Sequence, residues 1–276
     1  MAPARAVAER RHGRTGLSVD GRDEGDFLRS LSRRSGGDEG RHGAPQNPSR
    51  PGARYSEDID LVIVGDRPEG HIKKALKRVL ARVLGEPSEN MFDTVKLAVR
   101  NLLRPSRIIR QVYPFNPTTG GEVMEVKVEA NCEERIPFYA VVDLEHPMPD
   151  GSLFPVRSYD LDEMLGTKMR ALLQRDQGRD IFDLWWALTQ PTAFFTPEPG
   201  RIIEAFQHYM DQEGTTVTYD HFAAEIDRKL KIPGFRTDVD VFLRPGLPKY
   251  DIDAAASYLM DKLISLLRDH HPRSSP

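Results

Sequence analysis

The chain has 276 residues, a formal net charge of −3 and one cysteine. Its length is sufficient for one large domain or two modest domains, each with its own core. No stretch approaches the roughly 20 consecutive apolar residues of a membrane-spanning helix, which excludes a protein anchored in that way. One cysteine excludes an internal disulfide and a cysteine-based metal site, and it favours a cytoplasmic location. The acidic balance gives no overall attraction to nucleic acid, so RNA binding would need a local basic patch.

Residues 1–53 differ in composition from the rest of the chain. Glycine, serine, proline and arginine dominate this segment, lysine is absent, and large apolar side chains are scarce. Such a composition cannot bury enough apolar surface to offset the chain entropy lost on folding. We therefore expect a disordered N-terminal tail.

The rest of the chain changes from strands to helices near residue 158. Its first element is the β-rich run from Ile59 to Val64, which we predict to be a strand. Periodic apolar residues predict a helix over 71–84. Further strands are expected near 95–99, 108–112, 123–130 and 138–144, and helices at 160–175, 179–189, 200–211, 218–230 and 251–268. The sequence thus predicts an α/β (α+β) fold, with a mixed-sheet domain over 54–157 and a helical domain over 158–276.

Two aspartates lie at the beginning of the first strand. Asp58 and Asp60 should share one face of it, because successive side chains of a strand alternate between faces. Two like charges this close repel one another, and a Mg²⁺ ion between them would remove the repulsion. Such a site indicates phosphoryl or nucleotidyl transfer. The alternative is a solvated strand end, since Asp-x-Asp alone is a common pattern.

A third carboxylate lies on a later strand. The segment around residues 124–130 alternates cleanly, with Glu129 on the face opposite the apolar side chains. On a strand beside the first one, Glu129 would complete an acidic trio with Asp58 and Asp60 and permit a two-metal geometry. The alternative is an edge strand whose charged residues face water.

One lysine lies within the apolar stripe of the first helix of the helical domain. Ser158 or Asp160 can cap this helix, and Lys168 falls between Leu165 and Leu172 at about 100° per residue. A lysine in such a stripe is costly without an anionic partner. The partner could be a nucleotide triphosphate or a buried carboxylate of the protein, or the side chain could extend along the stripe to water.

The next helix offers two carboxylates for this lysine. Asp180 and Asp183 lie three residues apart, so they are neighbours on one side of the helix. They could hold Lys168 or Arg175 in place. Trp185 in the same helix is interpreted as part of the core.

Four segments carry a recognisable pattern: Arg54 to Leu61, Lys127 to Glu129, Lys168 to Arg175 and Gly178 to Leu184. In this order and spacing they resemble the AbiEii/AbiGii-type nucleotidyltransferase toxins, which include the MenT toxins and belong to the DNA polymerase β-like nucleotidyltransferase superfamily. The closing segment from Phe235 to Gly246 also resembles that family. The resemblance extends from Arg54 nearly to the end and makes residues 54–157 the nucleotidyltransferase domain.

The resemblance implies a Mg²⁺-dependent toxin of a type IV-like toxin–antitoxin (abortive infection) system. Such a protein transfers a nucleotide from an NTP to RNA, in several relatives to the 3′ end of tRNA, and has an AbiEi-like antitoxin as its partner. The implied metal ligands are Asp58, Asp60 and Glu129. The implied catalytic set adds Lys168, which would hold the triphosphate, and Asp183. The implied nucleotide-binding residues are Arg54, Ser56, Lys127, Lys168, Arg175, Arg179 and Asp180.

The chain departs from the family at its first motif. Family members carry a Gly-Gly-Thr or Gly-Ser turn shortly before the acidic strand, where backbone amides cradle phosphates. Only Gly36 and Gly37 could replace it here, without a helix-forming run after them. A mis-assigned start of the sequence is our interpretation. Three hypotheses follow: an active nucleotidyltransferase, a kinase-like enzyme that moves a γ-phosphate to a protein, and a truncated remnant that retains antitoxin or RNA binding.

Overall fold

The computed structural model describes two compact units, residues 1–159 and 160–276, and each is considered by itself. The described residues are 17–19, 54, 58–64, 68–84, 89–99, 102–115, 122–132, 136–147, 153–190, 196–244, 246–247 and 249–268. Within them, no helix is long and apolar enough to cross a membrane.

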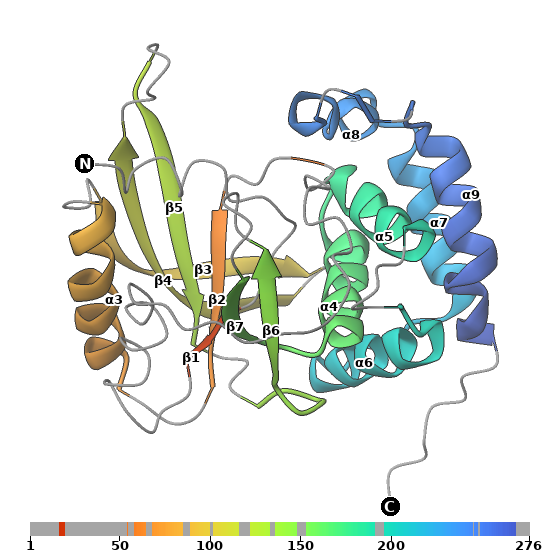
Figure 1. The fold of residues 1–276 in the computed structure, drawn as a ribbon. Coiled ribbons are helices and arrows are strands. Elements are labelled where there is room, and N and C mark those ends of the chain that lie inside the picture. The colour runs from red at the N-terminus through yellow and green to blue at the C-terminus, as the bar shows by residue number, and fades with distance from the viewer. Residues whose placement is uncertain are drawn as a thin grey trace, which may run out of the picture. The chain divides into compact units, whose positions relative to one another are not determined.

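The first unit contains a mixed sheet of seven described strands in the order β3-β4-β5-β2-β1-β7-β6 (Figure 1). Strand β2 is parallel to both of its neighbours, β1 and β5, while the remaining pairs are antiparallel. The strands are β1 (Leu17–Val19), β2 (Asp58–Ile63), β3 (Glu89–Val99), β4 (Leu102–Phe115), β5 (Met124–Asn131), β6 (Val142–Pro147) and β7 (Leu153–Ser158).

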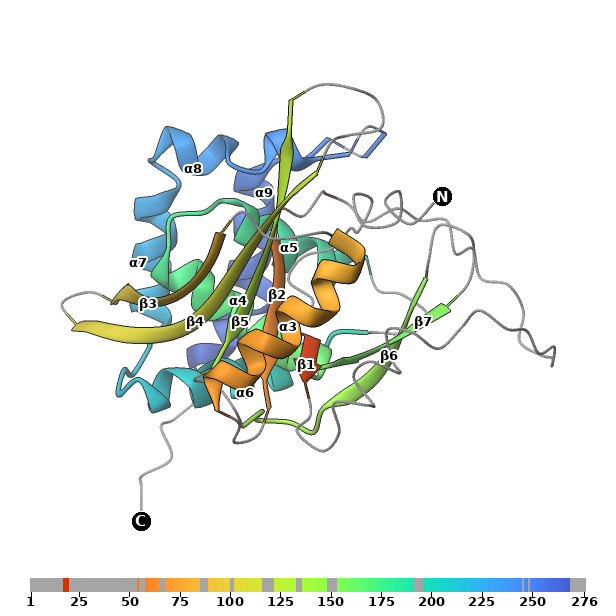
Figure 2. The same cartoon turned by 90° about the vertical axis from the view of Figure 1, so that its left-hand side faces the viewer.

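One face of this sheet is covered by helix α3 (Glu69–Leu84), which lies across the central strands in Figure 2. The helix contributes Ile72 and Leu76 to a core that also contains buried apolar side chains of β2, β4 and β5. On β2 the buried residues are Leu61 and Ile63, which alternate with the acidic positions. The strand therefore presents its aspartates on the face opposite α3.

The structure confirms most of the expected elements of this unit and corrects their boundaries. The strand around residue 59, the helix around residue 76 and the strands over 95–99, 108–112 and 123–130 are present. The strand expected over 138–144 begins only at Val142, and β7 was not predicted. Of the segment expected to be disordered, Leu17–Val19 form β1 beside β2; the rest of that prediction lies outside the described residues.

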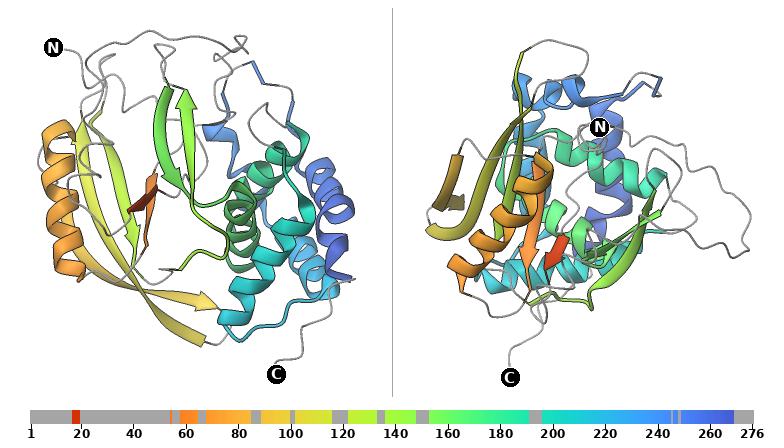
Figure 3. Two further views of the ribbon diagram at one scale, coloured as in Figure 1. Left: turned by 60° about the horizontal axis from the view of Figure 1, so that its bottom comes forward. Right: turned by 60° about the vertical axis from the view of Figure 1, so that its left-hand side comes forward.

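The second unit is helical, as predicted, and its helices enclose a separate apolar core. Helix α4 packs against α6, and α5 packs against α9 (Figures 1 and 3). The stretch expected as one helix over 251–268 is α9 followed by a short 3₁₀ helix. The elements are α4 (Leu161–Gln174), α5 (Arg179–Thr189), α6 (Pro199–Gln212), α7 (Tyr219–Lys229), α8 (Pro233–Thr237), η1 (Asp240–Phe242), α9 (Ile252–Lys262) and η2 (Ile264–Arg268).

Helix α4 is fixed at its N-terminus and along its length by specific contacts. Asp160 is its N-cap, since the carboxylate accepts the backbone N–H of Asp162 at 2.9 Å. Gly166 allows α6 to approach closely, because a Cβ there would lie 2.8 Å from the Cβ of Ala205. These contacts set the position of a helix that carries one of the expected site residues.

Candidate active site

The acidic residues of the first unit lie on two adjacent parallel strands. Asp60 of β2 is the register partner of Glu129 of β5, and Asp58 is the partner of Lys127. Register partners project on the same face of a sheet, so all four side chains lie on the face opposite α3. The predicted placement of Glu129 beside the aspartates is therefore confirmed at the level of strand pairing.

An arginine that the sequence reading missed lies next to Glu129. Arg110 of β4 is the antiparallel partner of Glu129, and its Nε donates to Glu129 Oε1 at 2.7 Å. The two side chains are 30% and 23% exposed, so solvent screens the pair only in part. The alternation of Arg110 with Ile109 could have placed Arg110 on the acidic face, but nothing local indicated which strand would lie beside β5.

The acids do not form a ready-made metal cage. Among the residues that the structure describes, no three His, Cys, Asp or Glu side chains gather closely enough to hold a metal ion. Mg²⁺ is commonly bound through one or two carboxylates together with water and substrate phosphates, without an all-protein cage. The assignment of Asp58, Asp60 and Glu129 as metal ligands stays a prediction.

The remaining expected residues of this unit are only partly described. Arg54 is buried, with 7% of its surface exposed, and Lys127 is exposed on β5. Ser56 lies outside the described residues, as do Gly36 and Gly37. The structure therefore does not test the phosphate-binding turn.

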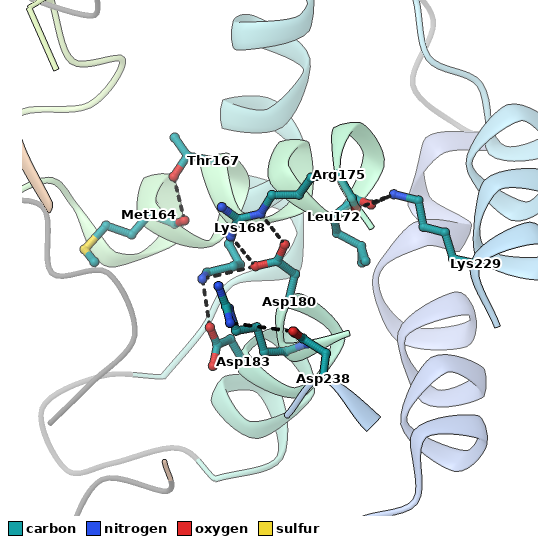
Figure 4. A network of polar contacts seen from close by, with 10 residues as sticks. Met164, Thr167, Lys168, Leu172, Arg175, Asp180, Asp183, Lys229 and Asp238 are labelled. Carbon is teal, nitrogen blue, oxygen red and sulfur yellow. Dashed lines mark hydrogen bonds and ion pairs between the residues drawn. The ribbon is translucent and has the colours of Figure 1, made fainter. Parts of the chain in front are cut away.

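In the second unit, Lys168 of α4 lies between two carboxylates of α5, as Figure 4 shows. Its Nζ is 2.7 Å from Asp183 Oδ2 and 3.3 Å from Asp180 Oδ1. The lysine side chain is 8% exposed, which rules out extension to water. Of the partners considered for Lys168, the buried carboxylate is confirmed.

Arg175 completes this network from the C-terminal end of α4. Its Nε and Nη2 donate to the two carboxylate oxygens of Asp180 at 2.8 and 2.7 Å, a bidentate pair. Asp180 is completely buried. It contacts both Lys168 and Arg175, as the sequence suggested. We call Lys168, Arg175, Asp180 and Asp183 the lysine–aspartate network.

Arg179, also expected to bind nucleotide, belongs to a different contact. Its backbone N–H donates to Asp238 Oδ2 at 3.1 Å, and its guanidinium lies 3.6 Å from the other carboxylate oxygen. The same guanidinium lies 5.1 Å from the centre of the Phe242 ring. These contacts tie the N-terminus of α5 to the segment that follows α8.

The two units together carry the residues that the sequence associates with nucleotidyl transfer: an acidic sheet face and a buried lysine. A sequence model of the family described as "Nucleotidyl transferase AbiEii toxin, Type IV TA system" matches residues 49–258. The chain belongs to this family of nucleotidyltransferase toxins. The resemblance drawn from the motifs after Arg54 is thereby confirmed.

Two crystal structures from Helicobacter pylori are similar to the chain at low sequence identity. JHP933 is 14% identical, with 78% of this chain and 77% of that chain covered and a TM-score of 0.38. A protein described as a candidate nucleotidyltransferase is 15% identical, with 79% and 83% covered and a TM-score of 0.40. No curated protein matches the chain.

Proposed function

We propose that this toxin transfers a nucleoside monophosphate from an NTP to RNA, with the 3′ end of tRNA as acceptor, in a Mg²⁺-dependent reaction. The observation that carries the proposal is the pairing of Asp60 with Glu129, which puts a third carboxylate on the face that bears the two aspartates. Family membership supports the reaction class. The choice of RNA rests on the resemblance described above.

The donor chemistry of the acidic face fits magnesium. Asp58, Asp60 and Glu129 offer carboxylate oxygens, which are the hard ligands that Mg²⁺ prefers. These three residues would hold the metal. When bound there, Mg²⁺ would neutralise negative charge on the phosphates of the NTP and favour attack on phosphorus.

The transfer step exchanges one phosphorus–oxygen bond for another. The terminal hydroxyl oxygen of the RNA attacks the α-phosphorus, and the bond from that phosphorus to the β-phosphate oxygen breaks. Pyrophosphate leaves with that electron pair, and a carboxylate of the acidic face accepts the hydroxyl proton. In-line geometry and charge neutralisation supply most of the catalysis in such reactions.

Within the lysine–aspartate network, Lys168 would supply the cationic group that contacts the triphosphate. Asp180 and Asp183 hold the ammonium of Lys168 at 3.3 and 2.7 Å, so little side-chain entropy is left to lose on binding. Lys168 would offset the charge that develops on the leaving pyrophosphate. Arg54, Ser56, Lys127, Arg175, Arg179 and Asp180 are proposed as further nucleotide-binding residues.

The family assignment also supports a protein partner. We propose that an AbiEi-like antitoxin is encoded with this toxin and counteracts it in the cytoplasm. Co-expression should relieve growth arrest by the wild-type toxin. Relief by a non-cognate antitoxin to the same degree would contradict a dedicated partner.

The decisive experiment follows label from NTPs into RNA. Purified protein is incubated with Mg²⁺, total tRNA and each NTP labelled at the α-phosphate, beside Asp60→Asn and a control, Asp143→Asn. Asp143 is an acid of β6 that is 70% exposed and pairs with Arg157 at 3.3 Å. Label on tRNA with wild type and the control, but not with Asp60→Asn, is the expected result.

Parallel reactions separate the two alternatives. Label that reaches a protein from the γ-phosphate, and no RNA label, would replace our proposal with the kinase-like reaction. No transfer by a folded protein that still binds antitoxin would make the chain a remnant. Chelation of Mg²⁺ should abolish transfer, and full activity in its absence would contradict the proposed metal.

A further inference from the structure

Helix α7 ends in a lysine that has no solvent-exposed surface. Lys229 is 0% exposed and ranks among the largest fully buried side chains of the described chain. A buried ammonium is costly unless hydrogen bonds replace its hydration. Neither the acidic face nor the lysine–aspartate network includes this residue.

The ammonium of Lys229 is bound by the C-terminal end of α4 (Figure 4). It donates to the backbone carbonyl of Leu172, to that of Leu173 at 3.0 Å and to that of Arg175 at 2.8 Å. The last carbonyls of a helix have no partner within the helix, and their partial negative charge favours a cation. An ammonium has three donors, which match these three acceptors.

One residue connects this contact with the network around Lys168. Lys229 binds the backbone carbonyl of Arg175, and the Arg175 side chain binds both carboxylate oxygens of Asp180. Asp180 in turn contacts Lys168, which lies one helical turn before Leu172. The Lys229 ammonium therefore supports the segment whose side chains position Asp180 and Lys168.

The α4–α5 turn has little freedom to shift away from this contact. Gly178 in the turn lies so close to α8 that a Cβ would be 1.9 Å from the carbonyl oxygen of Phe235. On the other side, Arg228 of α7 binds Asp176 at 2.5 Å. The turn is therefore held at Asp176 and Gly178, close to the carbonyls that Lys229 binds.

We propose that Lys229 is a positioning residue: its protonated side chain fixes the C-terminal end of α4 and, through Arg175 and Asp180, the place of Lys168. The link to nucleotide binding rests on the proposed function. The positional claim itself concerns only the second unit. Lys229 need not touch any substrate.

The protonation state of Lys229 can change near physiological pH. The pKa of Lys229 is lowered to about 8, and desolvation by burial is the largest cause. The nearby charge of Arg228 also lowers this pKa, and those of Asp176, Glu225 and Asp180 partly offset the shift by raising it. The neutral amine has two donors and a lone pair, so one of the three carbonyls would lose its hydrogen bond. As pH rises through this pKa, the end of α4 should therefore shift.

Deprotonation of Lys229 weakens its local hydrogen bonds, but its effect on the free energy of global unfolding has the opposite sign. The folded-state pKa of Lys229 lies below the ordinary lysine value of 10.5, so between about pH 8 and 10.5 the unfolded chain binds more protons at this residue. This group therefore raises the free energy of unfolding as pH increases through that window. A local change near pH 8 without loss of thermal stability would separate positioning from unfolding.

Tryptophan fluorescence can report this change without any enzymatic activity. The protein has two tryptophans, Trp185 and Trp186, and both lie in α5, directly after the turn that Lys229 supports. The experiment titrates emission across the Lys229 pKa in wild type, Lys229→Met and Lys231→Met, with excitation selective for tryptophan. Lys231 is an exposed lysine two residues further along the chain and serves as the matched control.

We expect an emission change centred near pH 8 in wild type and Lys231→Met and none in Lys229→Met. A flat wild-type titration, or the same transition in Lys229→Met, would overturn the proposal. If Lys229→Met does not fold, Lys229→Arg takes its place, because a guanidinium keeps its charge throughout this range. Persistence of the transition in that variant would likewise contradict the assignment.

Transfer assays then connect the position of Lys168 with nucleotide binding. Lys229→Met should raise the KM for NTP about tenfold at neutral pH. In wild type we expect the KM to increase as pH rises through the pKa of Lys229, and in Lys229→Met we expect no such increase. Unchanged KM and pH profile would overturn the functional link. If wild type transfers no label, the proposed function fails, while the fluorescence titration still decides the positional claim.

Discussion

The acidic face of the first unit and the lysine–aspartate network of the second differ in burial and in how their charges are arranged. Asp180 is fully buried, and it contacts both Lys168 and Arg175 within 3.3 Å. Glu129 is 23% exposed and binds Arg110. Asp58 and Asp60 are also partly exposed.

The difference in burial predicts different consequences when residues of the two sites are replaced. Removing one member of a buried charged network leaves another charge without its partner in a medium that solvates it poorly. A partly exposed acid on a sheet face retains much of its hydration, so its loss affects the fold little. We therefore expect substitutions in the network to lower stability, and substitutions on the acidic face to lower activity alone.

The largest expected effect is on activity, from Asp60→Asn. Loss of a proposed carboxylate metal ligand should reduce transfer about a thousandfold, or roughly 4 kcal/mol in activation free energy. The free energy of unfolding should change by less than about 1 kcal/mol. Label transfer and thermal denaturation measured on one preparation test both statements. A large fall in melting temperature would remove the contrast between the two sites.

Lys168→Met should have the largest effect on stability. The substitution leaves Asp183, which is 11% exposed, without its lysine, and the cost should be about 3 kcal/mol. Chemical denaturation measures this value. The control is Lys262→Met, because Lys262 is 58% exposed and contacts an aspartate that is 71% exposed. Equal stability of the two variants would show that the network contributes no more than a surface ion pair.

Gly178→Ala tests the α4–α5 turn without changing any charge. The new Cβ would lie 1.9 Å from the carbonyl oxygen of Phe235, so the turn must shift at a cost of about 2 kcal/mol. Gly200→Ala is the control, since nothing lies within 4 Å of a Cβ at that position. Thermal denaturation should separate them, and equal melting temperatures would mean that the turn accommodates the methyl group freely.

Arg110→Gln should produce the smallest effect. Loss of the 2.7 Å contact to Glu129 should reduce transfer about tenfold, because the carboxylate is no longer oriented. Stability should fall by less than about 1 kcal/mol, since the pair is partly exposed. Arg157→Gln, which removes an exposed pair with Asp143, is the matched control. Unaltered kinetics in Arg110→Gln would show that Arg110 does not orient Glu129 for the reaction.

The order of strands and helices was largely predictable, because apolar periodicity is a local property of the sequence. The missed elements have weak local signals. Strand β1 has three residues within a glycine- and arginine-rich segment, and β7 contains a proline. Strand β1 pairs with β2, which lies far along the chain, and β7 pairs both with β1 and with β6, its neighbour in the sequence.

The candidate site divides in the same way. Strand alternation was enough to put Asp58 and Asp60 on one face, and the apolar stripe around Lys168 was enough to require an anionic partner. Those statements use only geometry within one element.

Only the tertiary structure determined which groups meet across elements. The register of β2 with β5 pairs Asp60 with Glu129, and β4 brings Arg110 to the same carboxylate. Lys229 looks in the sequence like an ordinary basic residue at the end of a helix, yet packing buries it against the last carbonyls of α4. Residue types and local periodicity are properties of the sequence, whereas long-range partners depend on how strands pair and helices pack in the two cores.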